Sequence, residues 1–103
     1  FLFGLTGKYA GNRFGIKNGT LVLGRDPSCD IVFPVEAGGV APRHCEIAFD
    51  SRRSVGTVKA LDDGYATLIR DGERLIPHQE VLLHSGDVLW LTDKTNMFKI
   101  RIE

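Results

Sequence analysis

Short apolar stretches recur along the whole chain, and turn-forming residues separate them at short intervals. The alternation of apolar and polar residues is clearest in the stretch CEIAF, where it directs Cys45, Ile47 and Phe49 to one face of a strand. Gly, Pro, Asn and Asp occupy the breaks between such stretches. Short strands separated by turn signals are typical of an all-β sandwich or barrel, so the pattern predicts an all-β fold with no convincing helix.

The turn signals also place the individual strands. Asn18-Gly19 predicts a type I′ turn that joins the first two of these strands as a hairpin. The longest interruption is Pro34–Pro42, and a loop of that length in a small domain is a candidate binding loop. The expected strands are Asn12–Lys17, Thr20–Leu23, Asp30–Phe33, His44–Phe49, Gly56–Leu61, Ala66–Arg70, Glu80–Leu83, Asp87–Leu91 and Asn96–Ile102.

Composition limits the class of protein. The chain has 103 residues, of which 43% are hydrophobic and 25% charged, and this predicts one globular domain over residues 1–103. Thirteen basic residues balance thirteen acidic ones, so no net charge draws the chain to nucleic acid or to a membrane, and any anion site must be local. The chain begins and ends inside strands, so we expect a piece of a larger protein. Two cysteines are too few for a disulfide framework, which favours the cytoplasm.

Three separate stretches form a recognisable constellation. They are LVLGRDPSCDIVF from Leu21, VAPRHCEI from Val40 and GDVLWL from Gly86. In order and spacing they resemble the forkhead-associated (FHA) domain, and the resemblance covers nearly the whole chain. It implies a β-sandwich of about eleven strands in two sheets. It also implies a bacterial or signalling interaction module that recognises phosphothreonine peptides through loops at one end.

The resemblance assigns roles to four residues in the first and second of these stretches. A phosphate group favours a planar arginine that is always charged, with short hydroxyl or amide donors around it. Arg25 would supply the charge, and Gly24 would let the backbone bend at the end of its strand. The family's histidine falls on His44, which we expect to brace the neighbouring loop. The family's serine falls on Ala41, which has no hydroxyl to donate.

A second departure lies in the downstream turn. Tyr65 and Ala66 stand where the family often has Asn-Gly, so two donors to a phosphopeptide are missing in total. A hydrogen bond to a charged group is worth roughly 1.5–3 kcal/mol, so this loss would weaken binding by roughly two to four orders of magnitude. Arg43 could contribute a compensating charge, whereas Asp62-Asp63 would repel a phosphate in the same cleft. The sequence therefore predicts weakened or lost phosphate recognition.

Two alternatives stay open at this stage. The first is a phosphate-independent docking or assembly domain, similar to the degenerate FHA-like domains of bacterial secretion-system inner rings, where similar Ala-Pro-x-His sequences occur. The second is a solvated Arg25 that pairs with Asp26 or Glu36 instead of binding an anion.

An enzymatic or metal-dependent domain using His44 with Cys45 is disfavoured. No general base, orienting carboxylate and nucleophile fall together, and the Cys-x-x-Cys pairing of structural zinc is absent. We therefore expect no catalytic residues, no metal and no cofactor. The expected partner is a protein or a phosphothreonine peptide.

Overall fold

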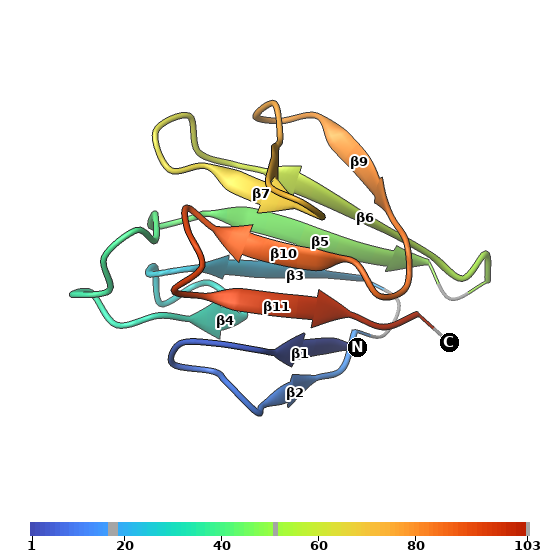
Figure 1. Ribbon diagram of the computed structural model, residues 1–103, viewed down its shortest axis with the longest axis horizontal. Helices are drawn as coiled ribbons and strands as arrows, with labels where there is room; N and C mark the ends of the chain where they lie inside the picture. Colours follow the sequence, from blue (N-terminus) through green and yellow to red (C-terminus); the bar gives the residue numbers. More distant parts are fainter. Residues whose placement is uncertain (17–18, 51, 103) are drawn as a thin grey trace.

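The computed structural model describes residues 1–16, 19–50 and 52–102, and these residues form eleven β-strands arranged as a sandwich of two sheets (Figure 1). The predicted all-β sandwich is therefore confirmed. The strands are β1 (Leu2–Gly4), β2 (Arg13–Phe14), β3 (Gly19–Gly24), β4 (Ile31–Val32), β5 (Cys45–Asp50), β6 (Val55–Ala60), β7 (Thr67–Ile69), β8 (Glu73–Arg74), β9 (Glu80–Leu83), β10 (Val88–Leu91) and β11 (Met97–Ile100).

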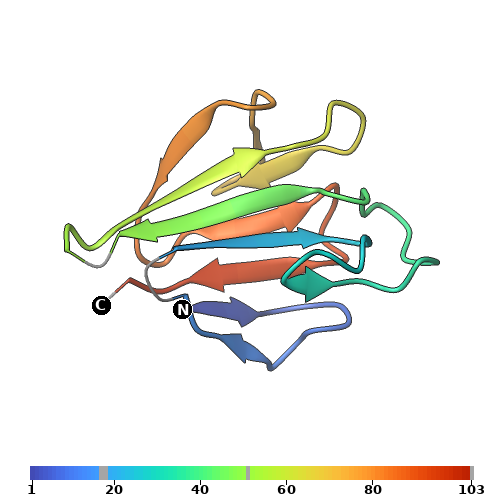
Figure 2. The same cartoon turned by 180° about the vertical axis from the view of Figure 1, so that it is seen from behind.

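The two sheets divide the strands unevenly. In the described part of the chain, one sheet has the order β2-β1-β11-β10-β7-β8 and the other has the order β4-β3-β5-β6-β9. We call them the six-stranded and the five-stranded sheet. All neighbouring strands run antiparallel except β3 and β4, which pair in parallel. The five-stranded sheet lies in front when the molecule is seen from behind (Figure 2).

The core lies between the sheets and consists of the inward residues of each strand. The burial of β11 alternates, so that Phe98 and Ile100 are buried while Met97 and Lys99 lie partly exposed. The ring of Phe98 meets the ring of Phe33 edge-on, with 6.3 Å between the ring centroids. This contact links the β10–β11 hairpin to the segment that follows β4, and so joins the two layers.

One pairing expected from the sequence is wrong. Asn18 lies outside the described residues, but the strands on either side of it belong to different sheets. β2 pairs with β1 through Leu2 and Phe14, whereas β3 pairs with β5. A turn dipeptide favours a change of direction, but it does not specify which sheet the next strand enters, and here the chain crosses from one layer to the other.

Three smaller differences concern strand ends and lengths. Phe49 is half-buried and lies outside the core cluster, because β5 reaches the open end of the sandwich at this residue. β4 is only two residues long, shorter than the expected Asp30–Phe33. The short strand β8 was not expected, because two exposed charged residues give no apolar signal.

Most of the longer loops gather at one end of the sandwich, on the left in Figure 1. We call this region the loop end; it comprises residues 5–12, 25–30, 33–44, 61–66 and 92–96. The opposite end carries the turns at residues 52–54 and 84–86. The loop end includes every residue to which the sequence assigned a role outside a strand.

The packing of Phe98 predicts a large effect on stability. Phe98 has no exposed surface, so Phe98→Ala removes a fully buried ring and should lower the free energy of unfolding by about 3–5 kcal/mol. Phe3→Ala is the matched control, because Phe3 lies on the neighbouring strand but is half-buried on the outer face. Urea denaturation should show a clearly smaller loss for the control. Equal losses for both variants would contradict the two-layer core.

Candidate functional site

The segment that precedes β5 lies directly against the end of β3. The backbone N–H groups of Arg25 and Asp26 donate to the carbonyls of Ala41 and Pro42, at 3.0 and 2.9 Å. The N–H of His44 donates to the carbonyl of Leu23 at 2.8 Å. These main-chain hydrogen bonds continue the β3–β5 ladder beyond the regular strands, so they hold residues 41–44 in a fixed position at the loop end.

Gly24 makes this close approach possible. A Cβ atom built on Gly24 would lie 2.2 Å from the carbonyl oxygen of Pro42 and 3.0 Å from that of Ala41. Backbone atoms cannot yield as a flexible side chain would, so any larger residue would push the segment away from β3. At Gly24, where the sequence predicted a bend, the backbone of β3 therefore lies directly against the backbone of residues 41–42.

His44 connects two loops from a fully buried position. Its Nδ1 accepts the N–H of Ala41 at 3.1 Å, and its Nε2 donates to the carbonyl of Ala66 at 2.8 Å. An imidazole that accepts at one nitrogen and donates at the other is neutral, with the proton on Nε2. This ring ties the segment before β5 to the loop between β6 and β7.

A third loop joins the same network through Thr92. The carbonyl of Ala66 accepts the N–H of Thr92 at 2.8 Å, and the Thr92 hydroxyl donates to the carbonyl of Gly39 at 2.6 Å. Thr92 adopts a φ of 69°, which is unusual for a β-branched residue. Sequence reasoning missed Thr92, because its residue type gives no sign of this conformation.

Arg25 makes its side-chain contacts with the long loop. Its Nε donates to the carbonyl of Val40 at 2.5 Å, and its Nη1 donates to the carbonyl of Val35 at 3.4 Å. The ion pairs found among the described residues do not include an Arg25 pair with Asp26 or Glu36. The guanidinium therefore uses two of its donor groups to hold residues 35–40 against β3.

Arg43 is exposed, and its charge acts on the carboxyl of Asp26. The backbone N–H and the side chain of Ser28 bond to Asp26 and lower the pKa of its carboxyl, and the positive charge of Arg43 lowers it further. The ion pairs found among the described residues do not include Arg43, so its charge acts on Asp26 from beyond direct contact and stays available to an anion.

The turn at residues 62–66 folds around its own carboxylate. Oδ2 of Asp62 accepts the N–H groups of Gly64 and Tyr65 at 2.9 and 2.8 Å. Tyr65 is 41% exposed, and its ring centroid lies 6.4 Å from that of His44. Of the predicted set, Tyr65 and Arg43 are exposed and Arg25 and Ala66 are partly exposed, whereas Ala41 has no exposed surface.

The cysteines do not form a reactive centre with His44. Burial raises the pKa of the Cys45 thiol to about 12, and burial also raises the pKa of the Cys29 thiol. Within residues 1–16, 19–50 and 52–102, no group of three or more His, Cys, Asp or Glu side chains is placed to hold a metal ion. The described segments also contain no helix of the length and hydrophobicity needed to cross a membrane.

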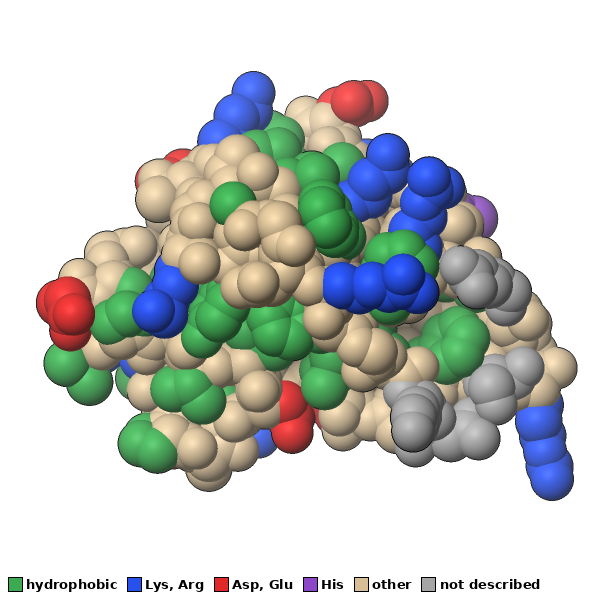
Figure 3. All heavy atoms as spheres, turned by 90° about the horizontal axis from the view of Figure 1, so that it is seen from below, with side chains coloured by type: hydrophobic (Ala, Val, Ile, Leu, Met, Phe, Trp, Pro, Cys, Tyr) green, Lys and Arg blue, Asp and Glu red, His purple; other side chains and the backbone are tan. Residues whose placement is uncertain are grey.

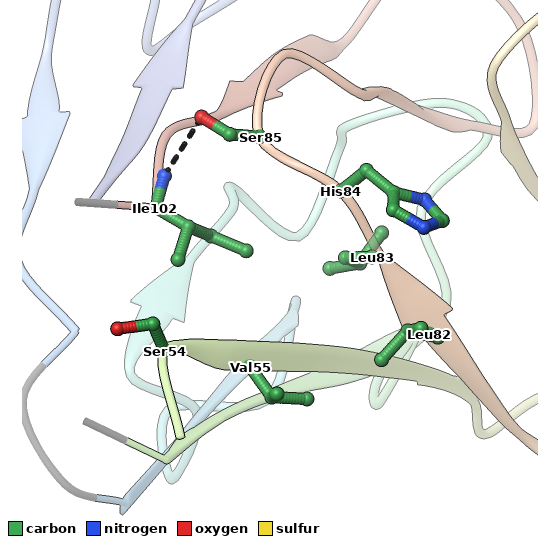
Figure 4. A pocket seen from close by; sticks show the side chains of 7 residues that line it. All are labelled: Ser54, Val55, Leu82, Leu83, His84, Ser85 and Ile102. Carbon is green, nitrogen blue, oxygen red and sulfur yellow. Dashed lines mark hydrogen bonds between the residues drawn. The ribbon is translucent and has the colours of Figure 1, made fainter. Parts of the chain in front are cut away.

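A separate hollow of about 340 Å³ lies at the opposite end of the sandwich (Figure 4). The side chain of Ile102 points into it, and the hydroxyl of Ser85 accepts the N–H of Ile102 at 3.1 Å. None of the predicted site residues contributes to this hollow. Its lining consists of Ser54, Val55, Leu82, Leu83, His84, Ser85 and Ile102.

Comparison with known families identifies the class of protein. The model of the FHA domain matches residues 21–92, which is more than half of the chain. The chain therefore belongs to the FHA domain family, as the motifs indicated. FHA domains are interaction modules that bind phosphothreonine peptides, and they are generally not enzymes.

Solved structures agree with this assignment. The chain is 25% identical to an FHA domain from a structural and functional analysis of phosphothreonine-dependent FHA domain interactions, with a TM-score of 0.76 over 99% of this chain and 94% of that one. It is 24% identical to the FhaA FHA domain, which was solved in complex with the intracellular domain of Rv3910, with a TM-score of 0.75 and 97% of both chains covered.

A third similar structure is the FHA domain of the CT664 protein from Chlamydia trachomatis, at 23% identity and a TM-score of 0.77, over 95% of this chain and 91% of that one. The comparison with curated proteins returned no match.

The buried imidazole predicts a pH dependence of stability. Burial lowers the pKa of His44 below its ordinary value of 6.5, against the weaker upward effects of the bond to Ala66 and the charge of Asp62. The unfolded chain therefore binds the proton more readily than the folded one. The contribution of the neutral His44 ring to the free energy of unfolding should be present above pH 6.5 and lost as the pH falls below that value. The reason is that a protonated Nδ1 cannot accept the N–H of Ala41.

His44→Gln provides the matched comparison, because an amide offers one donor and one acceptor but does not titrate. The variant is expected to be less stable than the parent at neutral pH, with a difference that shrinks on acidification. Urea midpoints measured across this pH range test the idea, and a difference that stays constant with pH would contradict it.

Proposed function

We propose that this domain is a protein-interaction module that binds its partner through the loop end, with weakened phosphothreonine recognition. The proposal rests mainly on the hydrogen bonds of Arg25, whose guanidinium donates to the carbonyls of Val40 and Val35. In a phosphate site that arginine would direct its donors at the ligand. Here two of the five N–H groups of the guanidinium are committed to the long loop, so a phosphate could use only the remaining three.

Two further features support the same conclusion. Ala41, at the position of the family's serine, has no hydroxyl and no exposed surface, so it offers no donor to a ligand. Arg43 is exposed, and its positive charge contributes to the lowered pKa of the Asp26 carboxyl. A phosphopeptide would therefore meet one arginine with two N–H groups committed to carbonyls and one exposed arginine whose field also acts on Asp26.

An array of phosphothreonine peptides and matched threonine peptides tests this proposal. Phosphorylation should raise affinity by no more than about tenfold, the effect of one exposed charge contact. Arg25→Ala is expected to weaken phosphorylated and unphosphorylated peptides alike, because it releases the loop that both would contact. Tight binding that requires the phosphate and disappears in Arg25→Ala would show that the inherited activity is intact and the proposal is wrong.

A second candidate function is phosphate-independent docking or assembly, and the exposed apolar side chains of the loop end favour it. Val35 is 76% exposed at the start of the long loop, and Tyr65 is 41% exposed in the loop between β6 and β7. Large apolar side chains at this exposure are common anchors of protein interfaces, and tyrosine is enriched among them. The two residues come from the loops that His44 and Thr92 tie together.

This candidate predicts a different response to mutation. Any unphosphorylated peptide that binds in the array should lose about fivefold or more in affinity on Tyr65→Ala, the effect of removing one aromatic anchor. Ala41→Ser should leave that binding unchanged. Leu82→Ala serves as the control, because Leu82 is 49% exposed but lies on β9, outside the loop end. A loss caused equally by Leu82→Ala would place the contact elsewhere.

A further inference from the structure

The outer face of the six-stranded sheet carries partly exposed apolar side chains in register. Phe3 of β1 pairs with Lys99 of β11, which pairs with Val88 of β10. In the next row, Met97 pairs with Trp90, and Trp90 pairs with Leu68 of β7. Because paired residues point to the same side of a sheet, and the alternate residues of these strands are buried in the core, these side chains form one outward surface.

Cations accompany this surface. Arg13 pairs with Phe3 at the edge, and its guanidinium lies 3.7 Å from the centroid of the Phe1 ring. Lys99 lies in the same row, and Nζ of Lys94 lies 5.1 Å from the centroid of the Trp90 ring. The view from below, onto the edge formed by β1 and β2, shows Lys and Arg side chains next to hydrophobic ones, together with a few Asp or Glu side chains (Figure 3). We call this surface the basic-aromatic face; it comprises Phe3, Leu68, Val88, Trp90 and Met97 with Arg13, Lys94 and Lys99.

Charge is unevenly distributed between this face and the rest of the molecule. Of the described residues at outward positions of β1, β2, β7, β8, β10 and β11, none is Asp or Glu. The ion pairs found among the described residues involve Arg53, Lys59, Arg70 and His84 rather than the cations of this face. Acidic residues lie at the loop end, including Asp26, Glu36, Asp62 and Asp63, and at the β8 edge of the six-stranded sheet, where Glu73 pairs with Arg70.

We infer that the basic-aromatic face is a second interaction surface, which shares only Lys94 with the loop end, and that it binds an acidic protein segment carrying apolar side chains. Charge complementarity specifies the sign of the partner, because carboxylates would pair with Arg13, Lys94 and Lys99. The apolar rows between these cations would bury leucine, isoleucine or phenylalanine side chains of the same segment.

The aromatic rings argue against nucleic acid as the occupant. A single strand binds by stacking its bases on open aromatic faces. Here a cation lies over the ring of Phe1 and another over the ring of Trp90. The far edge of the Trp90 ring lies against Gly72, because a Cβ on Gly72 would meet that ring at 3.5 Å. The rows also contain Val88, Leu68 and Met97, which offer no flat face to a base.

Trp90 makes the inference measurable, because it is the only tryptophan of the chain. The probe is a synthetic peptide built from Glu-Glu-Leu-Phe repeats, titrated into the domain while tryptophan fluorescence is followed. Binding should change the fluorescence and should weaken as salt is added. Backbone NMR shifts should map to β1, β10, β11 and Lys94 and leave residues 25–30, 33–44 and 61–66 of the loop end unchanged, which separates this surface from the proposed function.

A charge-reversed pair of variants completes the test. Arg13→Glu with Lys99→Glu should weaken the peptide by at least about tenfold, because two attractions become repulsions. Arg52→Glu with Arg53→Glu makes the same change in net charge on the β5–β6 hairpin and should have little effect. Melting curves of both double variants establish that each is folded.

Three results would overturn the inference. The first is no fluorescence change at millimolar peptide, and the second is equal weakening by both double variants. The third is binding of single-stranded polyuridylate RNA, sensitive to Arg13→Glu with Lys99→Glu, in the absence of peptide binding. That last result would assign the face to nucleic acid.

Discussion

A single neutral imidazole holds the loop end together. His44 is enclosed on all sides, and its two ring nitrogens reach the backbones of two loops that are more than twenty residues apart in sequence. The carbonyl that it binds, that of Ala66, also accepts the N–H of Thr92, so a third loop depends on the same position. The geometry available to a partner at this end is therefore set by one protonation state of one side chain.

Two different surfaces follow from the sandwich architecture. The loop end is formed where strands of both sheets stop, and its exposed side chains project from irregular backbone. The basic-aromatic face is formed by the middle of strands, and its side chains are spaced by the regular register of β1, β10 and β11. At the loop end, the conformation of the loops determines the shape of the binding site. At the basic-aromatic face, the strands determine it, so the binding site is flatter and more rigid.

The sequence predicted the architecture well, because strand alternation and turn residues report directly on which side chains are buried. Through the family resemblance it also singled out Gly24, His44 and Arg25, and in the structure all three lie where the segment before β5 meets a neighbouring element. It failed where the outcome depended on contacts distant in sequence. The hairpin at Asn18-Gly19 was wrong because local turn preference does not report sheet membership. The bonds of Arg25 to Val35 and Val40 could not be read from residue types, because a carbonyl acceptor is present at every residue. Thr92 was missed for the same reason.

Each bond in the frame of the loop end has a main-chain group on at least one side. Arg25, Asp26, His44 and Thr92 all bond to carbonyls or N–H groups of neighbouring loops, whose own side chains take no part. Substitutions at exposed loop positions such as Val35, Arg43 and Tyr65 would therefore leave that frame in place. In evolutionary terms, the partner of such a domain can be exchanged without rebuilding the scaffold, which lets one fold lose a phosphate ligand and still remain a binding module.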